Sequence, residues 1–462
     1  MTGIPRTYHG AASAAGQLLI VERTRRVTAG EWVRILSPNQ PERRGQVIDT
    51  SEDATVVHVQ QEMIGMAPAA AEIVLTGDVA HTVVGRDLLG RVLTGSGAPA
   101  DDLPPPIGED LRPISGAAIN PARRARPSDF IETGISAIDG LTTLVRGQKL
   151  PIFAGPGLPA LDLAARIVAW ARAPGNQEYA VIFVGMGITA RETAAFLATL
   201  GDAVHSERML LYLNEASDPP VERLLAPRVA LTQAEYLAFE HGMQVLVVMA
   251  DITHYCEALR EMGAARDEVP GRRGYPGYMY TDLAGLFERA GLIQGGMGSI
   301  TQIPVVTLPD DDITHPIPDL TGYITEGQIV LSRDLHRRGV NPPIDVLPSL
   351  SRLMGSGIGA DRTRAEHREV SDQLYALYAR GREALTMAAV VGMAGLTEAD
   401  RRAADFSSGF ERELIAQSAR RDIGETLDVG WRLVEALPRA DLTRIRTSTW
   451  ETRRTRAHRD AS

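Results

Sequence analysis

Cysteine is almost absent from this chain of 462 residues, in which Cys256 is the only one. A single cysteine cannot form a disulfide within the chain, so the fold has to be held by non-covalent interactions. Proteins of oxidising compartments often rely on disulfides, and we therefore expect a protein of a reducing compartment.

Long apolar runs are absent as well. No run approaches the roughly 18 residues that a membrane-spanning helix needs. The first residues lack the charged and then apolar pattern of a secretory signal peptide. We expect a cytoplasmic protein that does not insert into a membrane but can bind peripherally to the cytoplasmic face of one.

Positive charge is in deficit. The formal net charge is -10 and the isoelectric point is near 5.6, which argues against a general nucleic-acid-binding protein. The Arg-rich residues 453–459 are expected to form a solvated basic tail. The hydrophobic content of 44% is ordinary, so the chain can bury a sizeable core.

Lysine is the rarest charged residue. Lys149 is the only lysine, and every other basic residue besides histidine is an arginine. A site that needs a lysine must therefore use Lys149 or do without one.

The order of the predicted elements divides the chain into three parts. Residues 1–78 predict a small antiparallel β-barrel, in which His58 has a structural place. Residues 79–359 predict a parallel α/β domain, and 79–130 form its Pro- and Gly-rich connector. Residues 360–462 predict a C-terminal helical bundle with the basic tail. The expected barrel strands are 17–21, 31–36, 45–49, 54–60 and 71–75.

In the central part, apolar strands alternate with helices, which predicts a parallel sheet covered on both faces. Ligands of such sheets bind at the carboxyl ends of the strands. A Gly-rich turn around Gly155 and Gly157 follows one strand, and Asp251 follows another. The expected strands are 150–154, 180–184, 209–213 and 243–250, and the expected helices include 160–173, 232–242 and 252–261.

The C-terminal part reads as helical throughout. One helix is expected over residues 362–391, and a second begins after a capping box at Thr397. In a third helix, Leu427, Trp431 and Val434 form a stripe at helical spacing, which predicts core packing rather than a cofactor site.

Residues 342–359 form the most distinctive segment. A proline pair stiffens its start, a Gly-Ser-Gly-Ile-Gly run is expected to loosen its end, and Arg352 is its one fixed positive charge. Such a segment presents a side chain at a defined place. The question is which charge Arg352 meets.

Four stretches resemble the B subunits of the V/A-type rotary ATPases. They read Thr-Gly-Ile-Ser-Ala-Ile-Asp-Gly (133–140), Arg-Gly-Gln-Lys-Leu-Pro-Ile-Phe (146–153), Gly-Arg-Arg-Gly-Tyr-Pro-Gly-Tyr-Met-Tyr-Thr-Asp (271–282) and Asp-Asp-Ile-Thr-His-Pro-Ile-Pro-Asp-Leu-Thr-Gly-Tyr-Ile-Thr-Glu (311–326). The resemblance covers nearly the whole chain and implies a β-barrel, a RecA-like central domain and a helical bundle. It also implies a non-catalytic chain that partners a catalytic A-type subunit. The segment at 342–359 matches the signature of rotary ATPase head subunits at Pro342, Asp345, Ser349 and Ser351.

The residues test that implication independently. A working P-loop reads Gly-x-x-x-x-Gly-Lys-Ser/Thr, and its backbone donors, lysine and hydroxyl hold phosphates and Mg²⁺. Here Pro156 and Pro159 each remove a backbone donor, Ala160 replaces the lysine and Leu161 replaces the hydroxyl. Lys149 lies on the wrong side of the turn. We predict that this loop does not hydrolyse ATP. The weak nucleotide-contact residues are Gly155, Gly157, Leu158, Pro159, Ala160, Leu161 and Asp251.

The next strand also lacks a residue that ATP hydrolysis needs. Ile188 stands where catalytic relatives carry a glutamate that orients the attacking water, and an isoleucine cannot do so. Arg191 and Glu192 are expected to pair on a helix face. Asp251 is either a helix cap or an acid that handles Mg²⁺ through water. We expect no resident metal and no tightly bound nucleotide on this chain.

The resemblance implies that Arg352 is an arginine finger that reaches into the active site of the catalytic A-type subunit. Phosphoryl transfer builds charge on phosphate oxygens, and a guanidinium matches that charge in a bidentate way. An ordinary surface or structural ion pair is the alternative.

The resemblance also implies the remaining partners. Three copies alternate with three A-type subunits in a hexameric ring, with ATP or ADP and Mg²⁺ at the A–B interface. The loop with Gly271, Arg272, Arg273 and Tyr275 is expected to face the central rotor shaft, with an Ω-type structural loop as the alternative. Contact with the peripheral stalk is implied too.

Two other functions compete with this interpretation. A self-sufficient hexameric ATPase of the secretion or helicase type needs a phosphate-binding lysine and a catalytic carboxylate, and both are missing at the matching positions. A stand-alone scaffold that kept the fold has no use for Arg352 as a finger.

Overall fold

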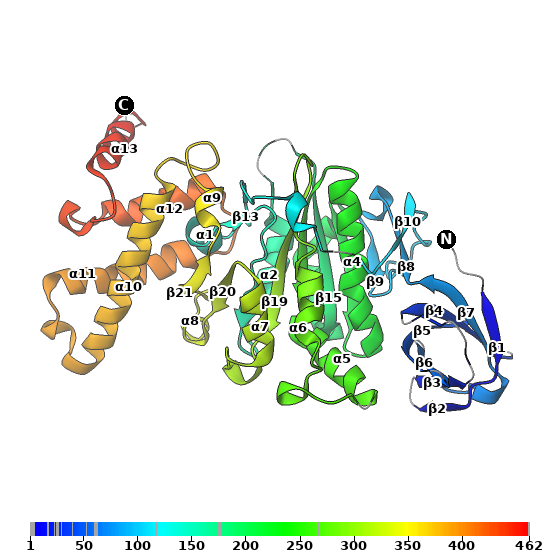
Figure 1. Ribbon diagram of the computed structural model, residues 1–462. Coiled ribbons are helices and arrows are strands. Elements are labelled where there is room, and N and C mark those ends of the chain that lie inside the picture. The colour runs from blue at the N-terminus through cyan, green and yellow to red at the C-terminus, as the bar shows by residue number, and fades with distance from the viewer. Residues whose placement is uncertain are drawn as a thin grey trace.

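A computed structural model describes residues 5–460, except 16–17, 23, 25–26, 29, 39, 52, 60–62, 117, 174, 176 and 267. Figure 1 shows an N-terminal β-sheet part, a central α/β part and a C-terminal helical part that follow one another along the molecule. The three-part fold class predicted from the sequence is confirmed.

The N-terminal part is an antiparallel sheet that curls into a half-barrel. Its described strands follow the order β1-β7-β4-β5-β6-β3-β2, with β1 and β2 at the two ends of the order. Val33 and Ile35 of β4 point into a core that Leu19, Val57 and Ile73 complete, as alternation along strands requires. The strands are β1 (Arg6–His9), β2 (Ser13–Ala15), β3 (Leu18–Glu22), β4 (Glu31–Leu36), β5 (Arg43–Thr50), β6 (Ala54–Val59) and β7 (Glu72–Val79).

The five predicted barrel strands are all present, whereas β1 and β2 were not predicted. The predicted strand ends at Gln17 and Gln60 lie outside the described residues. The two missed strands have only four and three residues, which is too short for an apolar alternation to stand out.

The central sheet follows the order β21-β20-β14-β19-β17-β15-β16-β9. Every neighbouring pair in this order is parallel except β20 and β21. Strand β9 comes from the predicted connector and closes the edge opposite to β21. The strands are β9 (Val92–Thr94), β14 (Ile152–Ala154), β15 (Tyr179–Ile188), β16 (Met209–Glu215), β17 (Gln244–Ala250), β19 (Ser299–Thr307), β20 (Gly327–Leu331) and β21 (Ile344–Ser351).

Helices cover both faces of this sheet, as predicted. Along β15, Val181 and Phe183 join the core shared with α2 and α3, while Ile182 and Val184 join the core under α4 to α7. The helices are α2 (Ala160–Trp170), α3 (Ala190–Leu200), α4 (Pro220–Phe239), α5 (Ile252–Ala265), α6 (Met279–Phe287) and α7 (Pro316–Ile324).

Helix α4 is much longer than predicted. It starts at Pro220 rather than at residue 232. A proline at the first position of a helix lacks only a donor that would have no partner there, so the Pro219-Pro220 pair marks a helix start and not a continuing turn.

The C-terminal part consists of α10 (His367–Val391), α11 (Glu398–Phe410), α12 (Ile423–Glu435) and α13 (Thr447–Asp460). Thr397 accepts a hydrogen bond from the Asp400 amide at the start of α11, and Leu427, Trp431 and Val434 are buried in the core as predicted.

The expected solvated tail is wrong at Arg453. This residue lies in α13, its Nε is 3.0 Å from a Glu435 carboxylate oxygen, and its guanidinium stacks on Trp431. A local run of arginines gives no sign of these distant partners.

Shorter elements complete the fold. They are β8 (His81–Val84), β10 (Asp110–Pro113), β11 (Arg124–Ala125), β12 (Phe130–Ile131), β13 (Leu144–Val145), β18 (Gly291–Ile293), α1 (Ser136–Leu141), α8 (Arg333–Arg337) and α9 (Met354–Gly357). Among them, β11 and β18 extend the central sheet from β19. In the part of the chain that the structure describes, no helix has both the length and the apolar character to span a membrane.

His58 makes the half-barrel sensitive to acid. Burial in β6, with a smaller contribution from the nearby positive charge of Arg266, lowers the pKa of His58 to about 4. Between pH 6.5 and 4, His58 therefore binds a proton in the unfolded chain but not in the folded chain. The free energy of unfolding falls as the pH falls through this window. The expected loss by pH 4 is about 3 kcal/mol.

We predict that His58→Gln weakens this pH dependence. Hydrogen–deuterium exchange of the barrel peptides at about pH 4 to 7 measures it, and His9→Gln, which alters the exposed histidine of β1, serves as the control. Equal acid sensitivity of His58→Gln and the parent chain would contradict the assignment.

Candidate functional site

The loop between β14 and α2 does not form a phosphate cradle. Its amides turn inward: the Leu158 amide donates to the Gly155 carbonyl at 3.1 Å, and the Ala160 amide donates to the Leu158 carbonyl at 2.8 Å. Pro156 and Pro159 have no amide hydrogen to offer. Two of the backbone donors that could surround a phosphate are therefore missing, and two more are used within the loop.

The side chains of the loop are equally unsuited to nucleotide. Ala160 is buried, and Leu158 and Leu161 pack against the core shared by α2 and the sheet. Asp162 follows in the first turn of α2 and pairs with Arg166 at 2.9 Å. This places an acid, and no amine or hydroxyl, at the helix N-terminus.

Asp311 and Arg333 cover the loop. A Cβ atom built on Gly155 would lie 1.7 Å from Asp311 Oδ1, so the carboxylate rests directly on the glycine. Arg333 Nη2 donates to Asp311 Oδ1 at 2.8 Å and to the Pro156 carbonyl at 3.0 Å. Asp311 follows β19, which lies beside β14 in the sheet.

Sequence reasoning did not single out this pair. The only signal was an acidic run after a strand, Asp310-Asp311-Asp312, and its place over the loop depends on the strand order. Because the Asp311 carboxylate lies over Gly155 and the lysine is missing, the loop lacks groups that a P-loop uses to hold ATP with Mg²⁺.

Asp251 is a helix cap that also joins two strands. Its carboxylate accepts from the Thr253 amide at 2.7 Å, from the Thr307 amide at 3.1 Å and from the Thr307 hydroxyl. These contacts connect the ends of β17 and β19 and match the structural alternative for Asp251.

Ile188 ends β15 as a buried side chain that packs close to Gly185. The prediction that Glu192 pairs with Arg191 is wrong. Glu192 instead accepts from the amide and the hydroxyl of Thr189, both at 2.8 Å, and completes a capping box at the start of α3. Adjacent side chains of a helix do not face each other, whereas Thr189 and Glu192 are three residues apart and do.

The signature residues fix β21 in place. Pro342 is buried. The Ser349 hydroxyl donates to the Asp345 carbonyl at 2.5 Å and accepts from the Val330 amide at 2.9 Å. The Ser351 hydroxyl donates to the Thr143 carbonyl at 3.0 Å.

The prediction that residues 342–359 loosen at their glycine-rich end is wrong. Met354–Gly357 form the helical turn α9, and a Cβ atom on Gly357 would lie 2.8 Å from the Val145 side chain. The glycine is needed for close packing against β13. Arg352 therefore lies between two regular elements, β21 before it and α9 after it.

Arg352 follows the last residue of β21 and is exposed. Its amide donates to the Glu326 carbonyl at 2.9 Å, and its Nη1 donates to the Thr325 carbonyl at 3.1 Å. Among the described residues, no carboxylate lies within ion-pairing distance of its guanidinium. The positive charge of Arg352 is thus held at the surface, where a group of another molecule can pair with it.

The predicted rotor-facing loop is anchored from inside. Tyr275 is buried, its hydroxyl donates to Glu257, and its ring packs edge-on against His315. The Tyr275 side chain therefore points inward, because α5 supplies a polar partner and His315, at the start of α7, supplies a ring.

The other residues of that loop are exposed. Gly271, Arg272 and Arg273 lie at the surface, and Arg273 pairs with Asp312 at 3.0 Å. Of the four predicted shaft-facing residues, these three can meet another chain directly.

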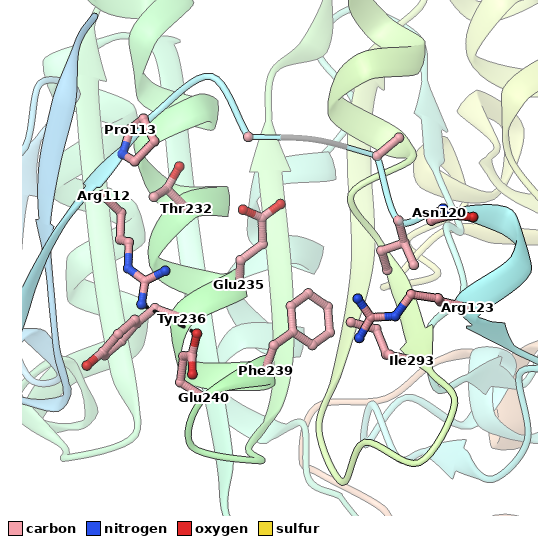
Figure 2. Close-up of a pocket in the computed structure, with 13 residues that line it drawn as sticks. Arg112, Pro113, Asn120, Arg123, Thr232, Glu235, Tyr236, Phe239, Glu240 and Ile293 are labelled. Carbon is pink, nitrogen blue, oxygen red and sulfur yellow. Dashed lines mark hydrogen bonds and ion pairs between the residues drawn. The ribbon is translucent and has the colours of Figure 1, made fainter. Parts of the chain in front are cut away.

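A separate pocket of about 460 Å³ opens between the connector and α4 (Figure 2). None of the predicted site residues lines it. Three of its four charged side chains have partners: Arg112 faces Glu240 at 3.4 Å, and Glu235 pairs with Arg289 at 2.6 Å. Arg123 is the fourth, and one arginine does not make a ligand site. We assign it no ligand.

Comparisons with known proteins agree with this anatomy. Residues 134–351 match the nucleotide-binding domain of the ATP synthase alpha/beta family, and residues 356–454 match the C-terminal domain of V and A type ATP synthase.

The similar proteins extend over nearly the full chain. A V-type ATP synthase beta chain from Anaeromyxobacter sp. (strain Fw109-5) is 59% identical over 99% of both chains, and one from Anaeromyxobacter sp. (strain K) is 58% identical over 96% of this chain and 94% of the other. The solved structure of the ATP synthase subunit NeqB from Nanoarcheaum equitans is 36% identical, with a TM-score of 0.72, and covers 91% of this chain and 100% of its own.

We predict that Ala160→Lys alone will not create ATP hydrolysis in the isolated chain. The prolines still lack donors, and Ile188 still cannot orient water. Phosphate release measures turnover, and a fluorescent ATP analogue measures binding.

The double variant Ala160→Lys/Asp311→Asn isolates the effect of the carboxylate. It should bind the analogue more tightly than Ala160→Lys, again without turnover, because the repulsion at Gly155 is gone. Measurable phosphate release by Ala160→Lys would overturn this view of the loop.

Proposed function

Since the chain belongs to the ATP synthase alpha/beta family, among the V-type ATP synthase beta chains that are B subunits of rotary ATPases, we propose that its own part in catalysis is to supply Arg352 to a neighbouring subunit. The observation that carries the proposal is the ordered, exposed guanidinium without a carboxylate partner among the described residues. The chain's own loop does not fit ATP, so the phosphate that needs this charge lies elsewhere.

The proposed target is ATP with Mg²⁺ on the catalytic A-type subunit. In phosphoryl transfer, negative charge spreads over the equatorial oxygens of the γ-phosphate. A guanidinium is planar, permanently charged and able to donate two parallel hydrogen bonds, so it stabilises that charge without a change of protonation. Held at its backbone and at one Nη atom, Arg352 loses little conformational freedom when it engages.

The position of Arg352 on the sheet suits this role. Strand β21 is the edge strand at one end of the sheet order, and an edge can meet an adjoining chain, whereas the carboxyl ends of the inner strands meet this chain's own loops. A ring neighbour can therefore approach Arg352 from outside this chain.

The assembly follows from the same proposal. Three copies alternate with three A-type subunits in a hexameric ring, with Pro342, Asp345, Ser349 and Ser351 supporting the A–B interface. The ring surrounds a central rotor shaft, contacts a peripheral stalk and sits peripherally at the cytoplasmic face of a membrane.

The exposed residues Gly271, Arg272 and Arg273 are the proposed contacts with the shaft. We retain residues 1–78, 79–359 and 360–462 as the proposed domain boundaries.

The competing self-sufficient hexameric ATPase is less well supported. It would need a phosphate cradle, a lysine and a water-orienting carboxylate within this chain, and the loop at Gly155, the buried Lys149 and Ile188 offer none of them. A scaffold without a catalytic partner would leave the exposed, ordered charge of Arg352 without a use.

The partner can be tested by co-purification. A tagged copy of the chain, isolated from its native cell, should bring down a second chain that carries a complete Gly-x-x-x-x-Gly-Lys-Ser/Thr loop. The tagged chain should show no ATP hydrolysis by itself, and robust turnover by the chain alone would refute the assignment.

Arg352→Ala should lower ATP turnover of the reconstituted A–B ring by about 10³-fold or more, with assembly intact. Arg352→Lys should restore little, because an ammonium group cannot make the bidentate contact. Steady-state hydrolysis measures turnover, and size-exclusion chromatography measures assembly.

The matched control is Arg191→Ala, which removes an exposed arginine at the start of α3. It should leave turnover close to that of the parent ring. A ring with Arg352→Ala that turns over ATP at the parent rate would rule out the finger.

A further inference from the structure

Lys149 is buried between two glutamates. Its side chain is 4% exposed, and its Nζ lies 2.7 Å from Glu288 Oε1 and 3.0 Å from Glu326 Oε1. The Lys149 amide donates to Glu326 Oε2 at 2.8 Å. One residue therefore holds both oxygens of the Glu326 carboxylate.

This arrangement is a demanding use of a lysine. A buried ammonium is costly unless it is paired and hydrogen-bonded, and a lysine side chain loses much rotamer freedom when it is fixed. The two carboxylates pair with the ammonium. The contacts with Lys149 also fix the orientation of the Glu326 side chain.

The backbone of Glu326 in turn helps to hold Arg352. We call the carbonyl groups of Thr325 and Glu326, which accept hydrogen bonds from Arg352, the carbonyl mount. The Glu326 carbonyl accepts from the Arg352 amide at 2.9 Å and from Gln148 Nε2 at 3.1 Å. The preceding carbonyl, of Thr325, accepts from the guanidinium at 3.1 Å. Both contacts that hold Arg352 thus come from two consecutive residues, and Lys149 anchors the side chain of the second, Glu326.

The chain just after Glu326 has little room to shift. Gly327 pairs with Ser351 across the antiparallel β20–β21 ladder. A Cβ atom on Gly327 would lie 2.3 Å from the Leu350 carbonyl, and its φ is +148°. Displacement of Glu326 would therefore be passed on to the strand end that carries Arg352.

We propose that Lys149 and Glu326 are positioning residues for Arg352: their ion pair fixes the Thr325 and Glu326 carbonyls that aim the guanidinium. The proposal rests on the proposed function of Arg352. It gives the only lysine of the chain a part in the reaction of the ring, at the opposite end of β14 from the loop where an ATP-binding lysine would stand.

Glu288 offers a matched control. It pairs with the same ammonium and with Arg124 at 3.0 Å, but among the described residues no hydrogen bond joins it to Thr325, Glu326 or Arg352. Replacement of Glu288 by glutamine removes a carboxylate from Lys149 and leaves the carbonyl mount in place.

The test compares A–B rings that contain Glu326→Gln, Lys149→Met or Glu288→Gln. The first two should lower kcat by about 10- to 100-fold, because small misplacements of a catalytic group cost rate steeply, while KM stays within about twofold. Glu288→Gln should stay within about threefold of the parent, and Lys149→Arg should recover part of the loss, since arginine can pair with Glu326.

A double-mutant cycle separates positioning from general destabilisation. In an Arg352→Ala ring, Glu326→Gln should cause no further loss of kcat, because the group that it positions is gone. Full additivity of the two losses would overturn the inference, and so would an unchanged kcat in Glu326→Gln.

The two proposals fail in different ways. If Arg352→Ala lowers turnover and Glu326→Gln does not, the finger stands and the positioning role falls. If Arg352→Ala itself has no effect, the proposed function is wrong. Should Lys149→Met fail to assemble, the isosteric Glu326→Gln still decides the question.

Discussion

The edge strand β21, which leads to Arg352, depends on how one buried cation, Lys149, is paired. The ammonium of Lys149 needs two carboxylates, and these come from the end of α6 and the start of β20, far away in the sequence. A buried charge tolerates little displacement of its partners. The pairing therefore fixes the relation of α6, β14 and β20, and through β20 the place of β21.

The carboxyl ends of the inner strands of the sheet carry structural side chains. At the carboxyl ends of β14, β15 and β17 the chain places a self-bonded loop, a buried isoleucine and a helix-capping aspartate. These are the positions where a parallel α/β sheet normally binds ligands. The exposed charge of Arg352 follows the edge strand β21. The fold is thus retained, and in our proposal this charge acts in an adjoining chain.

Much of this could be predicted from the sequence. Period and turn residues indicate the three-part fold, and the residue types of the loop are enough to exclude a working phosphate site, because Pro156, Pro159, Ala160 and Leu161 fail for local reasons. What could not be predicted depends on distant partners. Asp311 covers Gly155 only because β19 lies beside β14, and Arg453 docks only because Glu435 and Trp431 face it. The glycines after Arg352 look flexible in isolation, but close approach to Val145 orders them.

The burial of Lys149 has a chemical consequence for the whole surface. Every other basic residue besides histidine is an arginine, and the single side-chain amine is neutralised by two carboxylates and shielded from solvent. Acylating enzymes and amine-reactive reagents act on exposed lysine, and acetylation there would remove a charge. The side chains of this protein give such chemistry no accessible target, so its surface charge cannot be reset by lysine modification, and amine-directed labels on the lysines of an assembled ring would report on the other chains.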